Sequence, residues 1–206
     1  MCRQELIQDY IWLNQIHSSE VIYLPKESFL ETTPSIDGIV TDTKDSFLTI
    51  LTADCLPVLF SDSSGEVIAA CHAGWRGLVG GILQNTLKEM VSIVRPDSKT
   101  SFYEGIHVYI GPAIGQKNYE VGVELKNLFT NKLQLTKLQS EQFFHSTQKH
   151  EKCLADLFGL AIHVLQSLRV SHIYTEKFCT FELEEYFYSY RKNKTTGRFA
   201  SCIWID

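Results

Sequence analysis

Cys55 and His72 are the two side chains whose types and positions first suggest chemistry. Cys55 directly precedes an apolar run at residues 56–60, and His72 directly follows a second apolar run at residues 67–71. Both runs have the length of β-strands and are bounded by turn-forming residues. If the two strands are neighbours, a thiolate and an imidazole converge at one edge of a sheet. This arrangement predicts an active site there.

A cysteine and a histidine together support two kinds of catalysis. One is nucleophilic attack by a thiolate that the imidazole activates. The other is a catalytic zinc site, which takes three nitrogen or sulfur ligands and keeps a fourth position for water or substrate. His17, beside Gln15 at the predicted end of a strand, is the best candidate for the third ligand. On spacing alone, an ordinary buried cysteine and two ordinary hydrogen-bonded histidines remain the alternative interpretation.

Charged residues near this stretch could complete a site. Arg76 follows His72 on a turn, where its guanidinium could hold a phosphate or a carboxylate in a bidentate fork. Arg191 and Arg198 flank a predicted hairpin turn and could add to an anion pocket. Asp54 could act as an acid or base, or could orient a histidine. The alternative roles are a surface ion pair for Arg76, solvated charges for the other two arginines, and a strand cap for Asp54.

The remaining pattern predicts the elements that must position these residues. We expect strands at residues 10–17, 21–24, 47–52 and 107–110, with a strand-like aromatic segment from His172 and a hairpin turn at residues 192–197. We expect helices at residues 79–94, 121–129 and 154–168. Residues 25–46, with a turn at Asp37-Gly38, and residues 131–151 are expected to be loops. Strands and helices interleave without a regular βαβ rhythm, which predicts an α+β fold with mixed sheets. No linker divides residues 1–206, so we expect a single domain.

Composition excludes several classes of protein. The 206 residues are 44% hydrophobic and 21% charged, which is enough to bury a core. The net charge is 19 − 24 = −5 and basic residues form no run, so a nucleic-acid partner is not expected. No apolar stretch reaches the roughly 18 residues that span a membrane. The N-terminus lacks a signal-peptide core, which predicts a cytoplasmic protein whose six cysteines are reduced.

Six sequence blocks then coincide, in order, with those of one family. They are QIH at 15–17, DGIVT at 37–41, TADCLPV at 52–58, CHAGWRG at 71–77, GPAIG with YEV at 111–121, and SYR with TGR at 189–198. The chain resembles the laccase-domain family, also called polyphenol-oxidase-like, whose members are purine nucleoside phosphorylases. The resemblance covers nearly the whole chain, and the TADCLPV and CHAGWRG blocks together are specific.

The resemblance implies a fold, a metal and a reaction. The fold would be mixed β-sheets packed together with flanking helices, in α/β/β/α layers. The metal would be zinc, held by His17, Cys55 and His72, which with Asp54 would form the catalytic group. The reaction would be phosphorolysis of adenosine, inosine and methylthioadenosine to a free base and a ribose 1-phosphate, with adenosine deamination as a side activity. Gln15 and the three arginines would then bind substrate or phosphate, in a monomer or a homodimer.

Other functions remain open at this point. A metal-independent cysteine hydrolase would use Cys55 as nucleophile and His72 as base, and a non-enzymatic protein would only retain a ligand or a metal. A copper-dependent polyphenol oxidoreductase is less expected, because one thiolate and two imidazoles lack the further histidines of a multicopper cluster. The chain departs from the family in two places: members usually carry a longer segment before Gln15, and Ala113 stands where many have cysteine.

Overall fold

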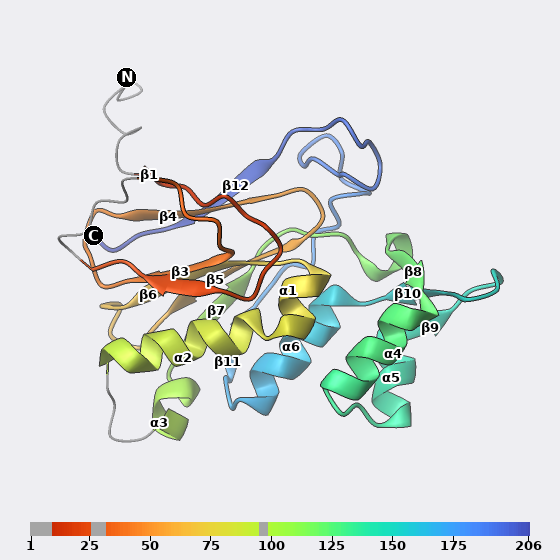
Figure 1. The fold of residues 1–206 in the computed structure, drawn as a ribbon, viewed down its shortest axis with the longest axis horizontal. Helices are drawn as coiled ribbons and strands as arrows, with labels where there is room; N and C mark the ends of the chain where they lie inside the picture. The colour runs from red at the N-terminus through yellow and green to blue at the C-terminus, as the bar shows by residue number, and fades with distance from the viewer. Residues whose placement is uncertain (1–9, 26–31, 95–98) are drawn as a thin grey trace.

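Two β-sheets pack face to face at the centre of the fold, and helices cover the outer face of the larger sheet (Figure 1). The computed structural model describes residues 10–25, 32–94 and 99–206. The layers therefore run from helices through the large sheet to the small sheet. The expected α+β class with packed, mixed sheets is confirmed, but no described helix covers the outer face of the small sheet (Figure 1), so the last layer of the expected α/β/β/α order is missing from the described residues. No described helix is both long enough and apolar enough to cross a membrane.

The large sheet has the strand order β11-β7-β5-β6-β3-β2. Its strands are β2 Val21–Tyr23, β3 Gly38–Thr41, β5 Leu56–Ser61, β6 Ile68–Ala73, β7 His107–Ile110 and β11 His172–Tyr174. The antiparallel partners β5 and β6 lie in the middle, in a register that places Leu56 opposite Ala73 and Pro57 opposite His72. The predicted pairing of the two apolar runs is confirmed, so Cys55 and His72 lie at the same end of the sheet.

Two smaller sheets complete the β-structure. The first has the order β1-β4-β12 and packs on the large sheet; its strands are β1 Tyr10–Ile11, β4 Phe47–Thr52 and β12 Phe199–Ile203. Leu48 and Ile50 of β4 are fully buried in the interface between the two sheets. The second has the order β8-β10-β9 and is formed by β8 Glu120–Gly122, β9 Phe144–Ser146 and β10 Lys152–Ala155.

The longest of the described helices packs on the large sheet, where it contacts β2, β3 and β6. The helices are α1 Trp75–Gly80, α2 Ile82–Val94, α3 Lys99–Glu104, α4 Val123–Lys132, α5 Lys137–Phe143 and α6 Leu157–Ser167, with a 3₁₀ turn at Gln116–Asn118. The helix expected at residues 79–94 is in fact two, since Gly81 adopts φ 94° and ends α1. A left-handed glycine is a common helix terminator because it has no Cβ to clash.

Three expectations for loops and strands were wrong. Within residues 25–46, the segment Gly38–Thr41 is a fully buried strand, because its neighbours β2 and β6 cover it on both sides. The 131–151 segment contains α5, capped by Thr136, and it buries Phe143 and Phe144. The strand expected at 10–17 ends at Ile11.

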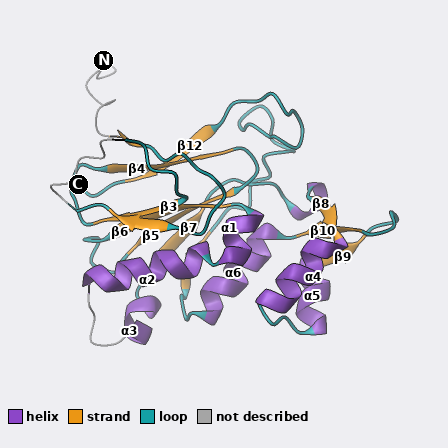
Figure 2. Ribbon diagram, in the orientation of Figure 1, coloured by secondary structure: helices purple, strands orange, loops and turns teal. Residues whose placement is uncertain are grey.

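The C-terminal aromatic segment also differs from the expectation. Between β11 and β12 it forms turns and irregular loop with an isolated bridge at Cys179 rather than a regular strand (Figure 2). The turn expected at residues 192–197 does not join two paired strands, because β12 pairs with β4 instead. This loop extends toward the end of the large sheet where Cys55 lies, and Tyr186, Tyr188 and Tyr190 are exposed on it.

Candidate active site

His17, Cys55 and His72 meet at one point although they are far apart in the sequence. Their ligand atoms all lie within 4.8 Å of one another, and no other group of three or more His, Cys, Asp or Glu residues in the described chain does this. Cys55 Sγ is 4.0 Å from His17 Nε2, and the two imidazole rings stand nearly perpendicular, at 78°. In a tetrahedral zinc site, sulfur and nitrogen ligands are roughly 3.5 Å apart. The three donors therefore fit a metal ion after a small contraction.

Three different elements supply these donors. His72 is held rigidly, because it lies in the central strand β6 and is 3% exposed. Cys55 lies in the short connection that leads into β5. His17 is in the loop before β2, with φ 62°, and not at the end of a strand as the sequence had suggested. An ion at this point would tie the loop to the large sheet.

Asp37 organises this cluster, although its place in the sequence predicts only a turn. Its side chain is fully buried, and its Oδ1 lies 2.7 Å from His72 Nδ1. A carboxylate on one ring nitrogen fixes the tautomer and leaves the other nitrogen as the ligand, which is the usual second contact of a metal-binding histidine. The free Nε2 of His72 faces the cluster, beside Gly74. The signal in the sequence was an acidic residue directly before the apolar run 38–41.

The same carboxylate shapes the loop that carries His17. It accepts hydrogen bonds from the backbone N–H groups of Ile16, His17 and Ser18, at 3.1, 3.0 and 2.6 Å, and from the Ser18 hydroxyl at 2.9 Å. These bonds account for the left-handed backbone of His17, because they turn three consecutive N–H groups toward one anion. Asp37 thus positions two of the three candidate ligands.

Hydrogen bonds, and not burial, set the charges in this cluster. Burial would raise the pKa of Asp37, but its bonds from His72 and Ser18 lower it to about 2. Burial would lower the pKa of His72, but Asp37 and Cys55 raise it to about 9. Burial would raise the pKa of Cys55, but His17 and His72 lower it to about 7. A thiol with this pKa is readily available as the thiolate, the form that binds metals and attacks electrophiles.

Gly74 leaves the space that the three donors require. A Cβ at this position would lie 3.0 Å from Cys55 Sγ, 3.0 Å from His17 Cδ2 and 3.6 Å from His72 Nε2. Its backbone, with φ −65° and ψ 165°, is open to any residue, so space is the only constraint. An ion must be reached by all three donors at about 2.0–2.3 Å, so even a methyl group here would compete with it.

We expect Gly74→Ala to fold normally but to bind a metal ion at least about 10-fold more weakly, because the added methyl group crowds two of the donors. Zinc content after dialysis and thermal unfolding of the metal-free protein would be measured together. The matched control is Gly105→Ala, where a Cβ would make only ordinary contacts, the nearest at 3.4 Å to Ser63. Equal zinc retention by both variants would contradict the assignment.

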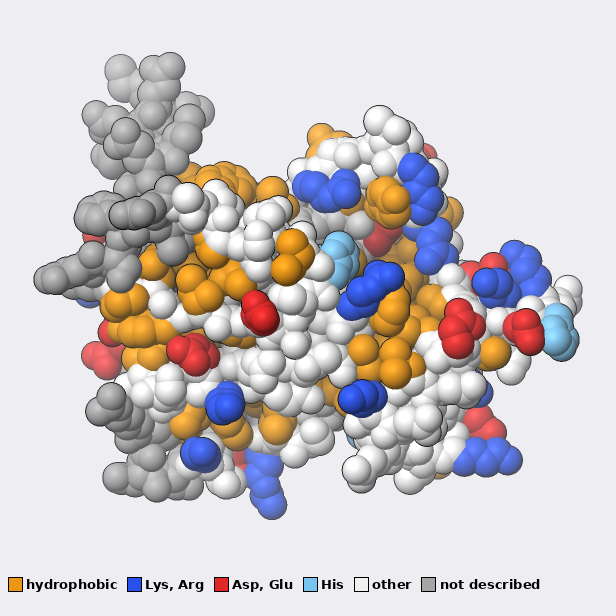
Figure 3. Space-filling model, in the orientation of Figure 1, with side chains coloured by type: hydrophobic (Ala, Val, Ile, Leu, Met, Phe, Trp, Pro, Cys, Tyr) orange, Lys and Arg blue, Asp and Glu red, His pale blue; other side chains and the backbone are white. Residues whose placement is uncertain are grey.

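A cavity of about 650 Å³ opens beside the cluster. Its wall combines the three donors with residues from β4, from α1, from the turn before β8 and from the loop before β12. The lining residues are Leu13, Gln15, His17, Leu51, Thr52, Ala53, Asp54, Cys55, His72, Trp75, Arg76, Ile114, Tyr119, Tyr190, Arg191, Lys194 and Arg198. This volume suits a small organic ligand. Basic side chains gather on this face around an exposed histidine (Figure 3).

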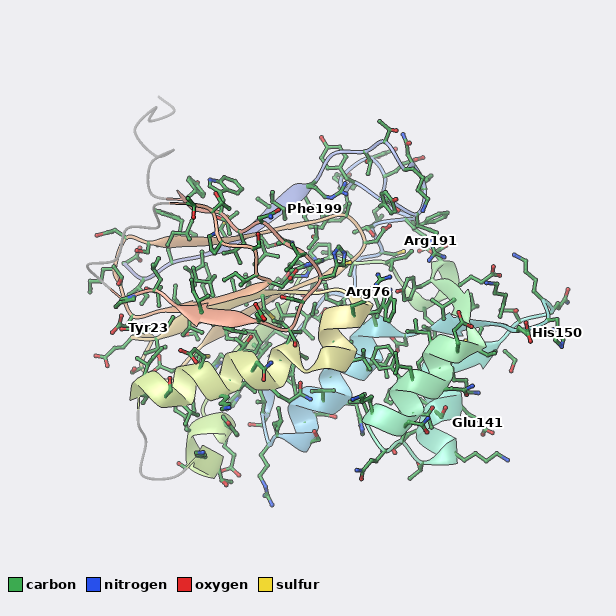
Figure 4. All side chains as sticks on the ribbon, viewed as in Figure 1. Tyr23, Arg76, Glu141, His150, Arg191 and Phe199 are labelled. Carbon is green, nitrogen blue, oxygen red and sulfur yellow. The ribbon has the colours of Figure 1, made fainter. Side chains whose placement is uncertain are left out.

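Four cations line the cavity, and three of them are the arginines expected from the sequence. Figure 4 shows Arg76 at the start of α1 and Arg191 on the C-terminal loop. The Arg76 guanidinium lies 4.3 Å from the centre of the Trp75 ring, and among the described residues it has no carboxylate partner. The Arg191 side chain is more restrained than that of Arg76, because its Nη1 donates a hydrogen bond to the Glu120 carbonyl at 2.8 Å.

The other two cations share one aromatic ring. Lys194 Nζ lies 4.1 Å from the centre of the Tyr190 ring, and Arg198 Cζ lies 5.8 Å from it. Arg198 also donates to the carbonyls of Thr196 and Gly197. Sequence reasoning missed Lys194, because nothing distinguishes it from any lysine in a polar loop. Four cations outnumber the negative groups of the described cavity wall, which are Asp54 and the Cys55 thiolate, and this excess favours an anionic ligand.

Asp54 and Gln15 line the cavity, but their side chains form hydrogen bonds with other parts of the fold. Asp54 accepts hydrogen bonds from the Thr180 hydroxyl at 2.7 Å and from the Arg191 backbone N–H at 2.6 Å, so it fastens the cationic loop next to Cys55. Gln15 exchanges two 2.8 Å hydrogen bonds with the backbone of Leu51 in β4. It is Asp37, and not Asp54, that bonds to His72.

Comparison with known proteins gives the same picture at the level of the family. The sequence profile described as multi-copper polyphenol oxidoreductase laccase matches residues 2–206. A Haemophilus influenzae protein named purine nucleoside phosphorylase is 37% identical over 201 residues, 98% of this chain and 76% of that protein. An Escherichia coli protein named purine nucleoside phosphorylase YfiH is 37% identical over 195 residues, 95% of this chain and 73% of its own length.

Solved structures agree with these sequence matches. A crystal structure of a Neisseria meningitidis protein has a TM-score of 0.80 at 38% identity, over 96% of this chain and 75% of the other. A Bacillus licheniformis protein has a TM-score of 0.86 at 24% identity, over 99% and 76%, and shows the fold alone. On these grounds the chain belongs to the multi-copper polyphenol oxidoreductase laccase family, in which relatives covering nearly all of it carry the name purine nucleoside phosphorylase.

Proposed function

We propose that this protein is a zinc-dependent purine nucleoside phosphorylase acting on adenosine, inosine and methylthioadenosine. The observation that carries the proposal is the His17, Cys55 and His72 cluster opening into a cavity lined by four cations. The names of the relatives supply the reaction class. Two imidazoles and one thiolate are typical zinc ligands, and as a set of three they keep a coordination position open for chemistry.

Phosphorolysis needs an anion held in line with the bond that breaks. A phosphate oxygen attacks C1′ of the ribose, the C1′–N9 bond breaks, and its electron pair leaves with the purine. Cationic groups fixed around the phosphate lower the barrier chiefly by positioning it and by balancing its charge. A bound zinc ion would supply Lewis-acid stabilisation of negative charge at the end of the cavity.

The residues of this chain divide these tasks by how free their side chains are. Arg76, without a carboxylate partner among the described residues, is the proposed principal phosphate ligand. Lys194 and Arg198, on the opposite loop, are proposed as further anion contacts. Arg191 and Asp54 act as positioning residues, because their polar atoms hold the loop to β8 and to the connection before Cys55.

The aromatic residues of the cavity suit a nucleoside. Trp75 and Tyr190 present ring surface beside the cations, and the buried Tyr119 lies behind Arg191 in the cavity wall. Flat rings bind a purine by stacking, and such contacts are worth about 1–3 kcal/mol per base. Burial raises the pKa of Tyr119 well above its usual value, so its hydroxyl remains a neutral hydrogen-bond donor at every working pH.

The test is base release from adenosine, inosine and methylthioadenosine with and without phosphate. We expect release to require phosphate and to yield ribose 1-phosphate, to stop on chelation, and to return with added zinc. Release that ignores phosphate would overturn the proposal. Formation of inosine from adenosine in the same assay would report the proposed deaminase side activity separately.

A cysteine hydrolase is the second candidate, favoured by the lowered pKa of Cys55 and its 4.0 Å approach to His17 Nε2. It would use the thiolate directly and would need no metal. Chelation separates the two functions: a thiol hydrolase keeps its activity when metal is removed, whereas the proposed phosphorylase loses it. A phenol-oxidising activity that increases with bound copper would argue against both the phosphorylase and the cysteine hydrolase, and would support a copper-dependent oxidoreductase.

Arg76→Ala should raise the KM for phosphate about 10- to 100-fold, because a charge-assisted hydrogen bond to an anion contributes about 1.5–3 kcal/mol. Zinc content should not change, since Arg76 is not among the candidate ligands. The matched control is Arg169→Ala, an exposed arginine outside the cavity. An unchanged KM for phosphate in Arg76→Ala would contradict the role given to Arg76 and would indicate that phosphate binds to the opposite loop. Lys194→Ala would test that alternative in the same assay.

A further inference from the structure

Two exposed histidines stack on each other at the far edge of the large sheet, outside the cavity. His107 begins β7 and His172 begins the edge strand β11, and the two are direct partners in the parallel register. Their ring centres are 4.6 Å apart and their planes differ by 9°. Both side chains are exposed.

The position of this pair follows from the way the sheets pack. The small sheet contacts β5 and β6, so it leaves the face at the β7 and β11 end open. Along β7 the residues alternate, with Val108 and Ile110 buried toward the helices and His107 and Tyr109 exposed on the open face. Apolar side chains would be expected to avoid such a face, and polar aromatic rings occupy it instead.

Tyr174 gives His107 a defined partner. The Tyr174 hydroxyl oxygen is 3.4 Å from His107 Nδ1, and the two rings are nearly parallel, at 7°. When Nδ1 carries the proton and donates it to this oxygen, Nε2 keeps its lone pair for an outside ligand. A second hydrogen bond of this kind is what orients metal-binding histidines elsewhere.

We propose that His107 and His172 form an accessory site for a divalent transition-metal ion, above all Cu²⁺, with water completing the coordination. Imidazole is a preferred ligand of copper, nickel and zinc, and Cu²⁺ binds most tightly to a given set of nitrogen donors. The stacked rings do not aim their nitrogens at one point, so a shared ion would require the exposed His172 ring to rotate out of the stack while Tyr174 holds His107. Two ligands fixed on adjacent strands bind one ion more tightly than either alone, because the second bond is intramolecular.

Copper bound at this site would affect the interpretation of any measurement of the total copper content of the protein. Its two imidazoles share no residue with the His17, Cys55 and His72 cluster, so copper can be held without entering the cavity. Total bound copper would therefore not report the occupancy of the active site.

The test uses untagged protein whose cavity has first been loaded with zinc, titrated with Cu²⁺ by calorimetry and followed by electron paramagnetic resonance. We expect one added copper per chain, no zinc release, and a signal from two coordinated nitrogens. His107→Ala and His172→Ala should each raise the Kd for Cu²⁺ by about 10-fold or more and leave one coordinated nitrogen. Base release from adenosine should be unchanged in both.

The matched control is His150→Ala, which removes an exposed histidine on another part of the surface. The inference is overturned if neither variant of the pair changes copper binding, if His150→Ala weakens it equally, or if copper enters only by displacing zinc. None of these outcomes depends on the proposed phosphorylase activity.

Discussion

Replacing Cys55 with serine should remove the bound metal and reduce kcat/KM for phosphorolysis by roughly 10³-fold or more. Cys55 is the only sulfur donor of the cluster, and a neutral hydroxyl replaces a thiolate whose pKa is about 7. His17 and His72 alone would then hold Zn²⁺ less tightly than the complete set of three donors. Zinc content by elemental analysis and base release with phosphate would be measured on the same preparation.

The matched control is Cys202→Ser, which changes a half-buried thiol in β12 whose Sγ lies 3.5 Å from the Thr49 hydroxyl, outside the candidate metal cluster. It should keep both zinc and activity. The two readouts also separate the candidate functions. A Cys55→Ser protein that keeps zinc but loses activity would favour the thiol nucleophile, and one that loses zinc but keeps activity would overturn the metal-dependent reaction.

Asp37→Asn should have the largest effect on stability, lowering the free energy of unfolding by about 3–5 kcal/mol. The fully buried carboxylate accepts bonds from three backbone N–H groups, from Ser18 and from His72. An amide would place its own N–H group against these donors and would remove one of the two negative groups, Asp37 and Cys55, that stabilise the charged form of His72. Zinc affinity should also fall, by about 10- to 100-fold, because the histidine loses its orienting partner.

Urea denaturation of metal-free and zinc-loaded protein would measure both effects. If Asp37→Asn does not fold, Ser18→Ala tests the same network more gently by removing one donor. The matched control is Asp42→Asn, an exposed aspartate shortly after β3, which should change stability by less than about 0.5 kcal/mol. Equal effects at the two positions would contradict the role given to Asp37.

The pH dependence of stability offers an independent check on Asp37. Its pKa is lowered to about 2 in the folded protein, below the usual value of about 3.9 in an unfolded chain. A lowered pKa contributes stability that is fully present above about pH 4 and is lost as the pH falls toward 2. The difference in stability between wild type and Asp37→Asn should therefore shrink over this interval, as denaturation at a series of pH values would show.

The pairing of β5 with β6 was predictable from short patterns in the sequence. The apolar runs of β5 and β6 are buried on both faces of a central sheet, so their hydrophobicity is nearly continuous and easily read. The predicted β4 agrees with the structure at both ends. Elements without such a pattern were missed: β3 has only four residues and begins inside the Asp37-Gly38 pair, which predicts a turn, and α5 lies in a polar segment.

By itself, the sequence determined which side chains could do chemistry. It also predicted that Cys55 and His72 lie at one end if the two apolar runs pair, because a short turn places the start of one antiparallel strand beside the end of the next. Only the tertiary structure decided how they are supported. A buried carboxylate at position 37 holds both His72 and the loop of His17, and Asp54 fastens a loop 137 residues away beside Cys55. Such contacts depend on which segments the packed sheets bring together, and no spacing along the chain encodes them directly.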